Sequence, residues 1–361
     1  MHSHTERNHW LDFCRSIAIL LVLLSHGRKI LPEDFLWREY LRFGGFIGVE
    51  LFFVLSGYLI GGILIRTNKQ ENKWINNFYL RRWFRTIPNY YLFILINIIL
   101  IYTEYRPGTL SDIGYYVFFS QNLFSPHPSF FPEAWSLAVE EIFYLTYPLT
   151  LLFFIKILKI EQNKAMLLSS ILVIVASLIG RISVANHVFS WDEGIRKIVF
   201  LRFDALMLGV LLALWKQKNK KPNTLIINFG IFIFFASIVY IAITPNKILD
   251  DSMFSKTILF NFASLGCAAV VISGLQLNFP EVWANFFNIL AKISFSAYLL
   301  NLPILSIINK INQPLPWWQV WLQFITFTLL ASYMVYKYFE KPTTDLRDYI
   351  KYKTQKPSHE Q

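Results

Sequence analysis

Apolar runs that recur about ten times along the chain constrain its fold more than any other feature. Each run is close to or above the length that spans a bilayer. A backbone in lipid must satisfy its polar groups internally, so runs of this kind form helices. The sequence therefore predicts an all-α, polytopic membrane helix bundle with about ten transmembrane helices. We place the runs near 10–27, 45–66, 87–104, 136–158, 165–182, 198–215, 225–243, 256–276, 288–308 and 317–338.

Composition supports a membrane protein. Only 16% of the 361 residues are charged, whereas 55% are hydrophobic and 17% are aromatic. A soluble domain has about 25% charged residues. The net charge of +11 is better explained by cytoplasmic loops than by nucleic acid, which we do not expect as a partner. The two cysteines, Cys14 and Cys267, lie in apolar runs and predict neither a disulfide framework nor a metal site.

Loop charge predicts the orientation of the bundle. The basic loops at 66–85, 156–164 and 216–221 alternate with a loop at 105–134 that is poor in Lys and Arg. The positive-inside rule then places both termini in the cytoplasm. The 28–42 loop opposes this orientation, because its four cations would lie outside.

We expect one membrane-embedded domain over 1–345 and a cytoplasmic basic tail over 346–361. No small-residue cleavage pattern follows the first apolar run, so we expect that run to remain as a helix.

The first run carries two ionisable residues, Arg15 and His26. Eleven residues return a helix to nearly the same face, so the two side chains share one stripe, about 16 Å apart along the axis. Ionisable groups inside a membrane usually face a polar interior and indicate function. The alternative is that Arg15 reaches the inner headgroups while His26 simply ends the helix at the outer interface.

The second run contains one carboxylate, Glu50, among apolar and small residues. Gly57 and Gly61 fall on its face and allow another helix to approach closely. Glu50 is therefore expected to point at a neighbouring helix. The alternative is an interfacial carboxylate that pairs with Arg38 or Arg42.

Further polar residues interrupt the fourth and sixth runs. Glu140 and Glu141 are consecutive, so their side chains diverge by about 100° and at most one faces a given site. In the predicted topology these groups share the depth of His26. We expect one cluster near the outer side of the bilayer, formed by His26, Glu50, Glu140 or Glu141, Arg202 and Asp204.

A basic cluster marks the cytoplasmic start of the third run. Arg82 and Arg85 are one helical turn apart, and Arg81 is adjacent. Arginine side chains in this arrangement suit a phosphate group. A basic cluster at this place also serves membrane topology or binds anionic lipid.

Taken in order, these segments resemble the acyltransferase-3 family of membrane acyltransferases. The resemblance rests on Arg15 with His26, Phe52-Phe53-x-x-Ser56-Gly57, Arg82-x-x-Arg85, Trp135-Ser136-Leu137 with Glu140-Glu141, and the later segments RFDALMLG and ISFSAYLLNLP. Two positions depart from the family pattern: Glu50 stands where Asp is common, and Asn301 stands where many relatives carry His. The hydrolase-like extracytoplasmic domain of some relatives is not expected here.

The resemblance implies transfer of an acyl group, most often acetyl, from cytosolic acyl-CoA to a hydroxyl of a surface glycan. Lipopolysaccharide O-antigen or an exopolysaccharide is the expected acceptor, and the bacterial cytoplasmic membrane the expected location. Rival interpretations are a transporter or flippase, a non-catalytic scaffold, and an acyltransferase that acts on a small molecule.

The resemblance also implies roles for particular residues. We expect His26 to be the general base in a direct transfer, steadied by Glu50 or by one of Glu140 and Glu141. Arg15 would line the acyl path or stabilise developing negative charge. The remaining candidates bind the donor or the acceptor: Arg81, Arg82 and Arg85 for the CoA phosphates, and Trp135, Ser56, Asn301, Arg202 and Asp204 around the substrate. Trp135 and Ser56 are also explained by packing alone.

Overall fold

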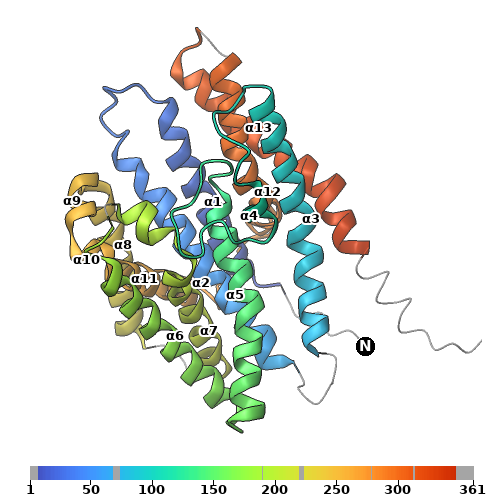
Figure 1. Cartoon of the computed structure of the whole chain (residues 1–361), viewed down its shortest axis with the longest axis vertical. Helices are drawn as coiled ribbons and strands as arrows, with labels where there is room; N and C mark the ends of the chain where they lie inside the picture. The colour runs from blue at the N-terminus through green and yellow to red at the C-terminus, as the bar shows by residue number, and fades with distance from the viewer. Residues whose placement is uncertain are drawn as a thin grey trace, which may run out of the picture.

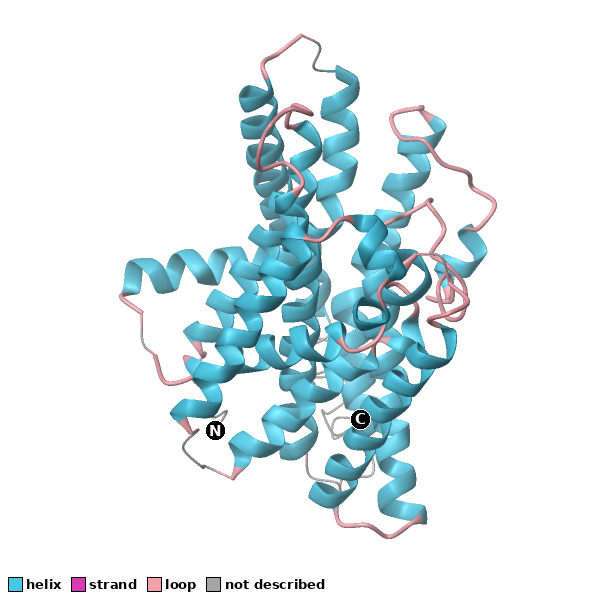
Figure 2. Ribbon diagram, turned by 90° about the vertical axis from the view of Figure 1, so that its left-hand side faces the viewer, coloured by secondary structure: helices cyan, strands magenta, loops and turns pink. Residues whose placement is uncertain are grey.

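The computed structural model describes residues 7–67, 74–188, 190–218, 223–277, 279–311 and 314–346, and every regular element within these ranges is helical (Figures 1 and 2). The long helices run mostly along the longest axis of the molecule (Figure 1). The predicted tail beyond 346 and the loop lysines Lys69, Lys73, Lys220 and Lys221 lie outside the described residues.

A helix overlaps each of the ten predicted apolar runs. These helices are α1 (His9–Gly27), α2 (Phe43–Arg66), α3 (Trp74–Tyr102), α5 (Ala134–Leu152), α6 (Gln162–Val184), α7 (Phe203–Gln217), α8 (Thr224–Ile243), α11 (Leu259–Ser273), α12 (Glu281–Ile311) and α13 (Trp317–Val335). Helix α7 begins five residues later than the run predicted at 198–215. Short α-helices are α4 (Ile113–Val117), α9 (Asn246–Asp251) and α10 (Met253–Lys256). Single turns are η1 (Arg28–Ile30), η2 (Tyr40–Arg42), η3 (Phe153–Ile157), η4 (Asp192–Arg196), η5 (Val199–Leu201) and η6 (Tyr336–Glu340).

Seven helical segments of the described chain are long and apolar enough to cross a membrane. They lie at His9–Ile30, Tyr40–Arg66, Trp74–Tyr102, Ala134–Ile157, Gln162–Val184, Thr224–Ile243 and Glu281–Ile311. The other three predicted spans correspond to α7 and α11, with 15 residues each, and α13, with 19. The protein is thus an all-α polytopic membrane bundle, and the count of ten spans and the cytoplasmic termini stay predictions.

The surface of the bundle is apolar where a bilayer would cover it. Helix α8 exposes Leu225, Ile226, Phe229, Phe232, Phe235, Val239 and Ile243, and α6 exposes Leu167, Leu168, Ile171, Leu172, Val175, Ile179 and Ile182. Patches of this extent are rare on soluble monomers and indicate contact with lipid. Several charged side chains, including Glu50, Arg181 and Arg202, are by contrast buried inside the bundle.

Helix α2 lies at the centre, packed against α1 on one side and α7 on another. Glycines permit both contacts: a Cβ added at Gly48 would lie 2.6 Å from the carbonyl oxygen of Ala18 in α1, and one at Gly57 only 1.8 Å from that of Leu206 in α7. Gly61 also meets α7, at Val210. The predicted close approach of a helix to the Gly57 and Gly61 face is confirmed, and α7 is that helix.

Candidate active site

Three cavities adjoin one another inside the bundle. The histidine cavity, of about 390 Å³, is lined by His26, Glu133 and Trp135 among others. The middle cavity, of about 90 Å³, is lined by Ser56, Arg82 and Glu140. The basal cavity, of about 380 Å³, is lined by Lys292, Glu340 and Lys341.

Shared side chains connect these cavities in series. Val49 and Tyr298 line both the histidine and the middle cavity, and Arg15 and Arg85 line both the middle and the basal cavity. Helix α12 passes all three: Ala291 and Lys292 reach the basal cavity, Ser294 and Phe295 the middle one, and Leu302 the histidine one. Arg15 and His26 therefore belong to one route through the protein, at different depths along α1.

His26 is held by an amide. Its Nδ1 lies 2.5 Å from Oδ1 of Asn301. The Asn301 Nδ2 group donates to the carbonyl oxygens of Ala297, at 3.2 Å, and Tyr298, at 2.5 Å. This pattern assigns the amide oxygen to the side facing the imidazole, and an oxygen can only accept. Nδ1 therefore carries the proton, and Nε2 bears the lone pair of a potential base.

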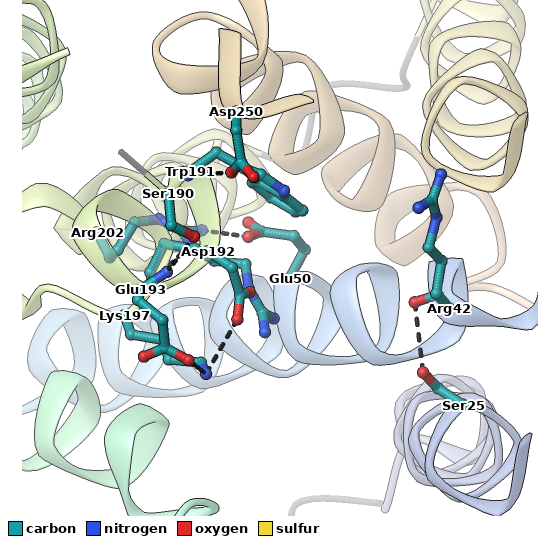
Figure 3. A network of polar contacts seen from close by, with 11 residues as sticks. Ser25, Arg42, Glu50, Ser190, Trp191, Asp192, Glu193, Lys197, Arg202 and Asp250 are labelled. Carbon is teal, nitrogen blue, oxygen red and sulfur yellow. Dashed lines mark hydrogen bonds and ion pairs between the residues drawn. The ribbon is translucent and has the colours of Figure 1, made fainter. Parts of the chain in front are cut away.

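The expected contact between Glu50 and His26 is not formed. Glu50 instead accepts a hydrogen bond from Arg202 through Oε1 (Figure 3). Its Oε2 accepts a second hydrogen bond, from Ser264 at 2.8 Å. The reason is helical geometry: the preceding residue, Val49, faces the two cavities, and one residue turns the side chain by about 100° toward α7 and α11. Neither Arg38 nor Arg42 pairs with Glu50.

Arg202 and Asp204 are also removed from the cavities. Both are fully buried, and Asp204 Oδ2 lies 2.8 Å from Nη1 of Arg181, with Asn261 donating to the same carboxylate at 3.1 Å. Arg202 Nη1 donates to the carbonyl oxygen of Arg196 at 3.1 Å, next to the histidine cavity. The cluster expected at one depth is therefore divided, and Glu50, Arg202 and Asp204 form a buried ionic network behind the cavity wall.

Of the two consecutive glutamates, Glu140 is the one that faces a cavity. In the middle cavity it accepts hydrogen bonds from Ser56 Oγ at 3.0 Å and from Tyr144 OH at 2.9 Å. Glu141 is buried but does not line the three cavities described above. The His26 Nδ1 contact is to Asn301 and not to a glutamate, so the proposed support of the imidazole by Glu140 or Glu141 is corrected as well.

Three arginines converge on the middle cavity from two helices. Arg15 comes from α1, and Arg82 and Arg85 come from α3, which begins at Trp74 rather than near the predicted 87. The Arg82 guanidinium lies 4.2 Å from the ring centre of Tyr144. Among the described residues, none of the three guanidinium groups has an ion-pair or hydrogen-bond partner. Arg81 is exposed and lies outside the lining of the three cavities.

The histidine cavity contains a carboxylate that the sequence did not point to. Glu133 Oε2 lies 3.3 Å from Nη2 of Arg106, and both side chains are buried. Its Oε1 has no hydrogen-bond partner in the described part of the chain. Burial raises the pKa of Glu133, and the neighbouring Arg106 opposes that shift. That oxygen, like the rest of the Glu133 side chain, is inaccessible to solvent, so the pair with Arg106 forms part of the wall of the cavity.

Trp135 lies in the same lining, with the Arg196 guanidinium 4.8 Å above its ring centre. Arg196 thus covers one face of the indole.

The 105–134 loop is more than a surface loop. Tyr116 and Asn122 are fully buried, and Asn122 Nδ2 donates to the carbonyl oxygen of Trp135 at 3.1 Å. His127 packs edge-on against Tyr116, and burial lowers its pKa to about 3, with Lys197 adding to the effect. The loop therefore shapes the cavity by supporting α5, and His127 stays neutral. No group of three or more His, Cys, Asp or Glu residues within the described ranges could hold a metal ion.

Comparison with known proteins places the chain in a family. The model of Acyl_transf_3, described as an acyltransferase domain, matches residues 8–337. Peptidoglycan O-acetyltransferase OatA of Listeria monocytogenes is 34% identical over 166 residues, which cover 41% of this chain and 25% of that protein. YrhL of Bacillus subtilis, whose name assigns it provisionally as a peptidoglycan O-acetyltransferase, is 27% identical over 95% of this chain and 56% of its own length. The chain thus matches about half of the length of YrhL and a quarter of the length of OatA. No solved structure matches the chain at a significant level.

Proposed function

Because the chain belongs to the acyltransferase-3 family, whose model covers residues 8–337, we propose that it is a membrane O-acetyltransferase. It would move an acetyl group from acetyl-CoA to a hydroxyl of a cell-surface glycan in a bacterial cytoplasmic membrane. The names of the relatives refer to O-acetyl transfer, and two of them to peptidoglycan as the acceptor. The observation that carries the proposal is the series of adjoining cavities, with arginines that form no ion pair among the described residues at one end and the His26 imidazole at the other.

The arginines support binding of the donor. Arg15, Arg82 and Arg85 present three guanidinium groups along the middle and basal cavities, and none of them forms an ion pair within the described residues. Arg15 and Arg82 are half-buried, whereas Arg85 is exposed. Half-buried cations favour a counter-charge, and guanidinium groups match phosphate oxygens in geometry. We assign the CoA phosphates to these arginines. The small volume of the middle cavity, about 90 Å³, favours a short acyl group over a long chain.

His26 supports the chemistry of transfer. Its Nε2 lone pair takes the proton of the acceptor hydroxyl while the hydroxyl oxygen attacks the thioester carbonyl carbon. The carbon–sulfur bond then breaks, and the CoA sulfur receives that proton from the imidazolium. Asn301 keeps the proton on Nδ1 throughout, so that Nε2 remains the reacting nitrogen.

Trp135 supports binding of a sugar beside His26, because it lines the histidine cavity and offers an aromatic wall. Ser56 donates to Glu140 instead of facing His26, so direct transfer needs fewer rearrangements than a serine-bound intermediate.

The proposal is tested with membranes that contain the native protein, His26→Ala or His187→Ala at matched abundance. His187 is an exposed histidine outside the lining of the three cavities and serves as the control. The membranes receive acetyl-CoA labelled on the acetyl group together with isolated surface glycan. We expect base-labile label in the glycan with the native protein and the control, and a loss of at least about 100-fold with His26→Ala. Equal labelling by His26→Ala would exclude His26 as the base.

A further inference from the structure

The lining of the histidine cavity carries more positive than negative groups. Five of its side chains are cationic and three are carboxylates. The cations are Arg28, Lys29, Arg42, Arg196 and Lys197, and the carboxylates are Glu133, Asp192 and Asp250. The question is which of these charges the protein already compensates.

Each carboxylate of the lining has a protein partner. Asp192 lies between Arg196 and Lys197, with the Lys197 Nζ at 2.9 Å (Figure 3). Although burial raises the pKa of Asp192, these two cations lower it to about 2, so the group stays an anion. Asp250 Oδ1 accepts the backbone N–H of Trp191 at 2.8 Å. Glu133 faces Arg106 through one oxygen, as described above.

Two further cations have structural roles. Arg42 donates through Nε to the carbonyl oxygen of Ile241 at 2.8 Å and through Nη2 to that of Thr244. These carbonyls belong to the C-terminal end of α8, where a cation is favourable. Arg28 pairs with the exposed Glu39 at 3.1 Å.

Lys29 remains uncompensated. It lines the cavity, its side chain is exposed, and in the described part of the chain its ammonium has neither a hydrogen bond nor an ion pair. In the predicted topology it also lies outside, where the positive-inside rule disfavours lysine. Lys29 thus contradicts the positive-inside rule, lies in the same cavity as His26 and has no structural partner among the described residues. These features favour a role in binding a ligand.

We propose that Lys29 binds an anionic group of the acceptor, a carboxylate or a phosphate, so that the acceptor is an acidic glycan. Lys29 follows His26 by three residues in the chain. The anionic group is therefore placed on the acetylated sugar or on its neighbour. This inference rests on the proposed function and adds the chemical class of the acceptor.

The test compares acceptors that differ only in charge. The full chain in lipid nanodiscs is given labelled acetyl-CoA and one of four probes. These are a disaccharide of N-acetylglucosamine and N-acetylmuramic acid, its carboxyl methyl ester, chitobiose, and chitobiose 1-phosphate. We expect KM for one or both anionic probes to be about tenfold lower than for the matched neutral probe.

Variants then assign the preference to Lys29. In Lys29→Met the advantage of the anionic probe should disappear, whereas Lys29→Arg should keep it. Lys247, an exposed lysine of α9 outside the cavity lining, provides the control Lys247→Met, for which we expect native behaviour. Preference for the muramic acid over its ester identifies a sugar carboxylate, and preference for the 1-phosphate identifies a phosphate.

The experiment distinguishes a wrong assignment of the acceptor from a wrong assignment of the function. Transfer that depends on His26 but is indifferent to probe charge, or a Lys29→Met effect of equal size on all probes, would overturn the acidic acceptor alone. Transfer that is absent with every probe would overturn the proposed function and this inference with it, whereas transfer that is unchanged by His26→Ala would exclude only His26 as the base.

Discussion

The side chain of Asn301 determines which nitrogen of His26 is free to act as the proposed base. Its Nδ2 is committed to two backbone carbonyls of α12, so its oxygen faces the imidazole and accepts the Nδ1 proton. In the family pattern stated above, many relatives carry His at this position. The amide supplies orientation without a charge, so His26 is held by a neutral partner.

We therefore expect Asn301→Ala to lower kcat by about 10- to 100-fold, with little change in KM for acetyl-CoA, because the ring loses the partner that fixes its tautomer. Asn301→Asp keeps an acceptor for Nδ1 and adds negative charge. It should recover much of kcat and shift the pH profile upward, since an anion favours the imidazolium. Steady-state rates over a range of pH measure both effects. A native kcat in Asn301→Ala would contradict the proposed role of Asn301 in fixing the tautomer of His26.

At the scale of elements, α2 is central to the site because each of its faces contacts a different part of the protein. Val49 lines the cavities, Glu50 enters the ionic network with Arg202, and Gly57 lets the α7 backbone approach. The network and the close contact hold α7 and the η4 turn in place, and η4 carries the Asp192 and Arg196 side chains of the cavity wall. Packing between α2 and α7 therefore supports the cavity from behind.

The tightness of this contact predicts opposite results for two glycines of α2. A Cβ at Gly57 would meet backbone atoms of Leu206, whereas one at Gly62 has Arg66 Nη2 as its nearest neighbour, at 3.7 Å. We expect Gly57→Ala to destabilise the protein by about 1–3 kcal/mol. Gly62→Ala should be neutral or stabilising by up to about 1 kcal/mol. Thermal unfolding midpoints in detergent measure the difference, and equal midpoints would show that α7 can move away without cost.

At the scale of the whole molecule, the cavities form a route along α1 and α12 from Lys341 at the basal end to His26 at the other. The arginines lie toward the basal end, and the histidine cavity, which we propose binds the acceptor, lies at the opposite end. Together with the predicted cytoplasmic termini, this arrangement lets a cytosolic donor react with an acceptor on the outer side.

The orientation can be measured with single cysteines. The native Cys14 and Cys267 are buried, so they give little background with a membrane-impermeant thiol reagent. Lys341→Cys should be labelled only from the cytoplasmic side, and Lys247→Cys only from the outer side. If both cysteines were labelled from the same side, the cavities could not form a route across the bilayer. If Lys341→Cys were labelled from outside and Lys247→Cys from the cytoplasm, the route would run in the opposite direction.

The sequence by itself determined the class of fold and the main chemical groups. Apolar runs specify membrane helices because lipid requires internal hydrogen bonding, and this requirement is local to each run. Polar residues inside such runs, including His26, Arg15 and Glu140, are recognisable because burying them is costly. The glycines of α2 likewise predicted a close helix contact, since small side chains are needed wherever backbones approach.

Only the tertiary structure decided which polar groups meet. Glu50 and Val49 are adjacent in the chain, yet one enters an ionic network and the other lines the cavities, because the positions of α1 and α7 around α2 set the use of each face. Asn301 reaches His26 across 275 residues, and Glu133 pairs with Arg106 across a folded loop. Such pairings depend on helix packing over long sequence separations, for which one sequence contains no local signal.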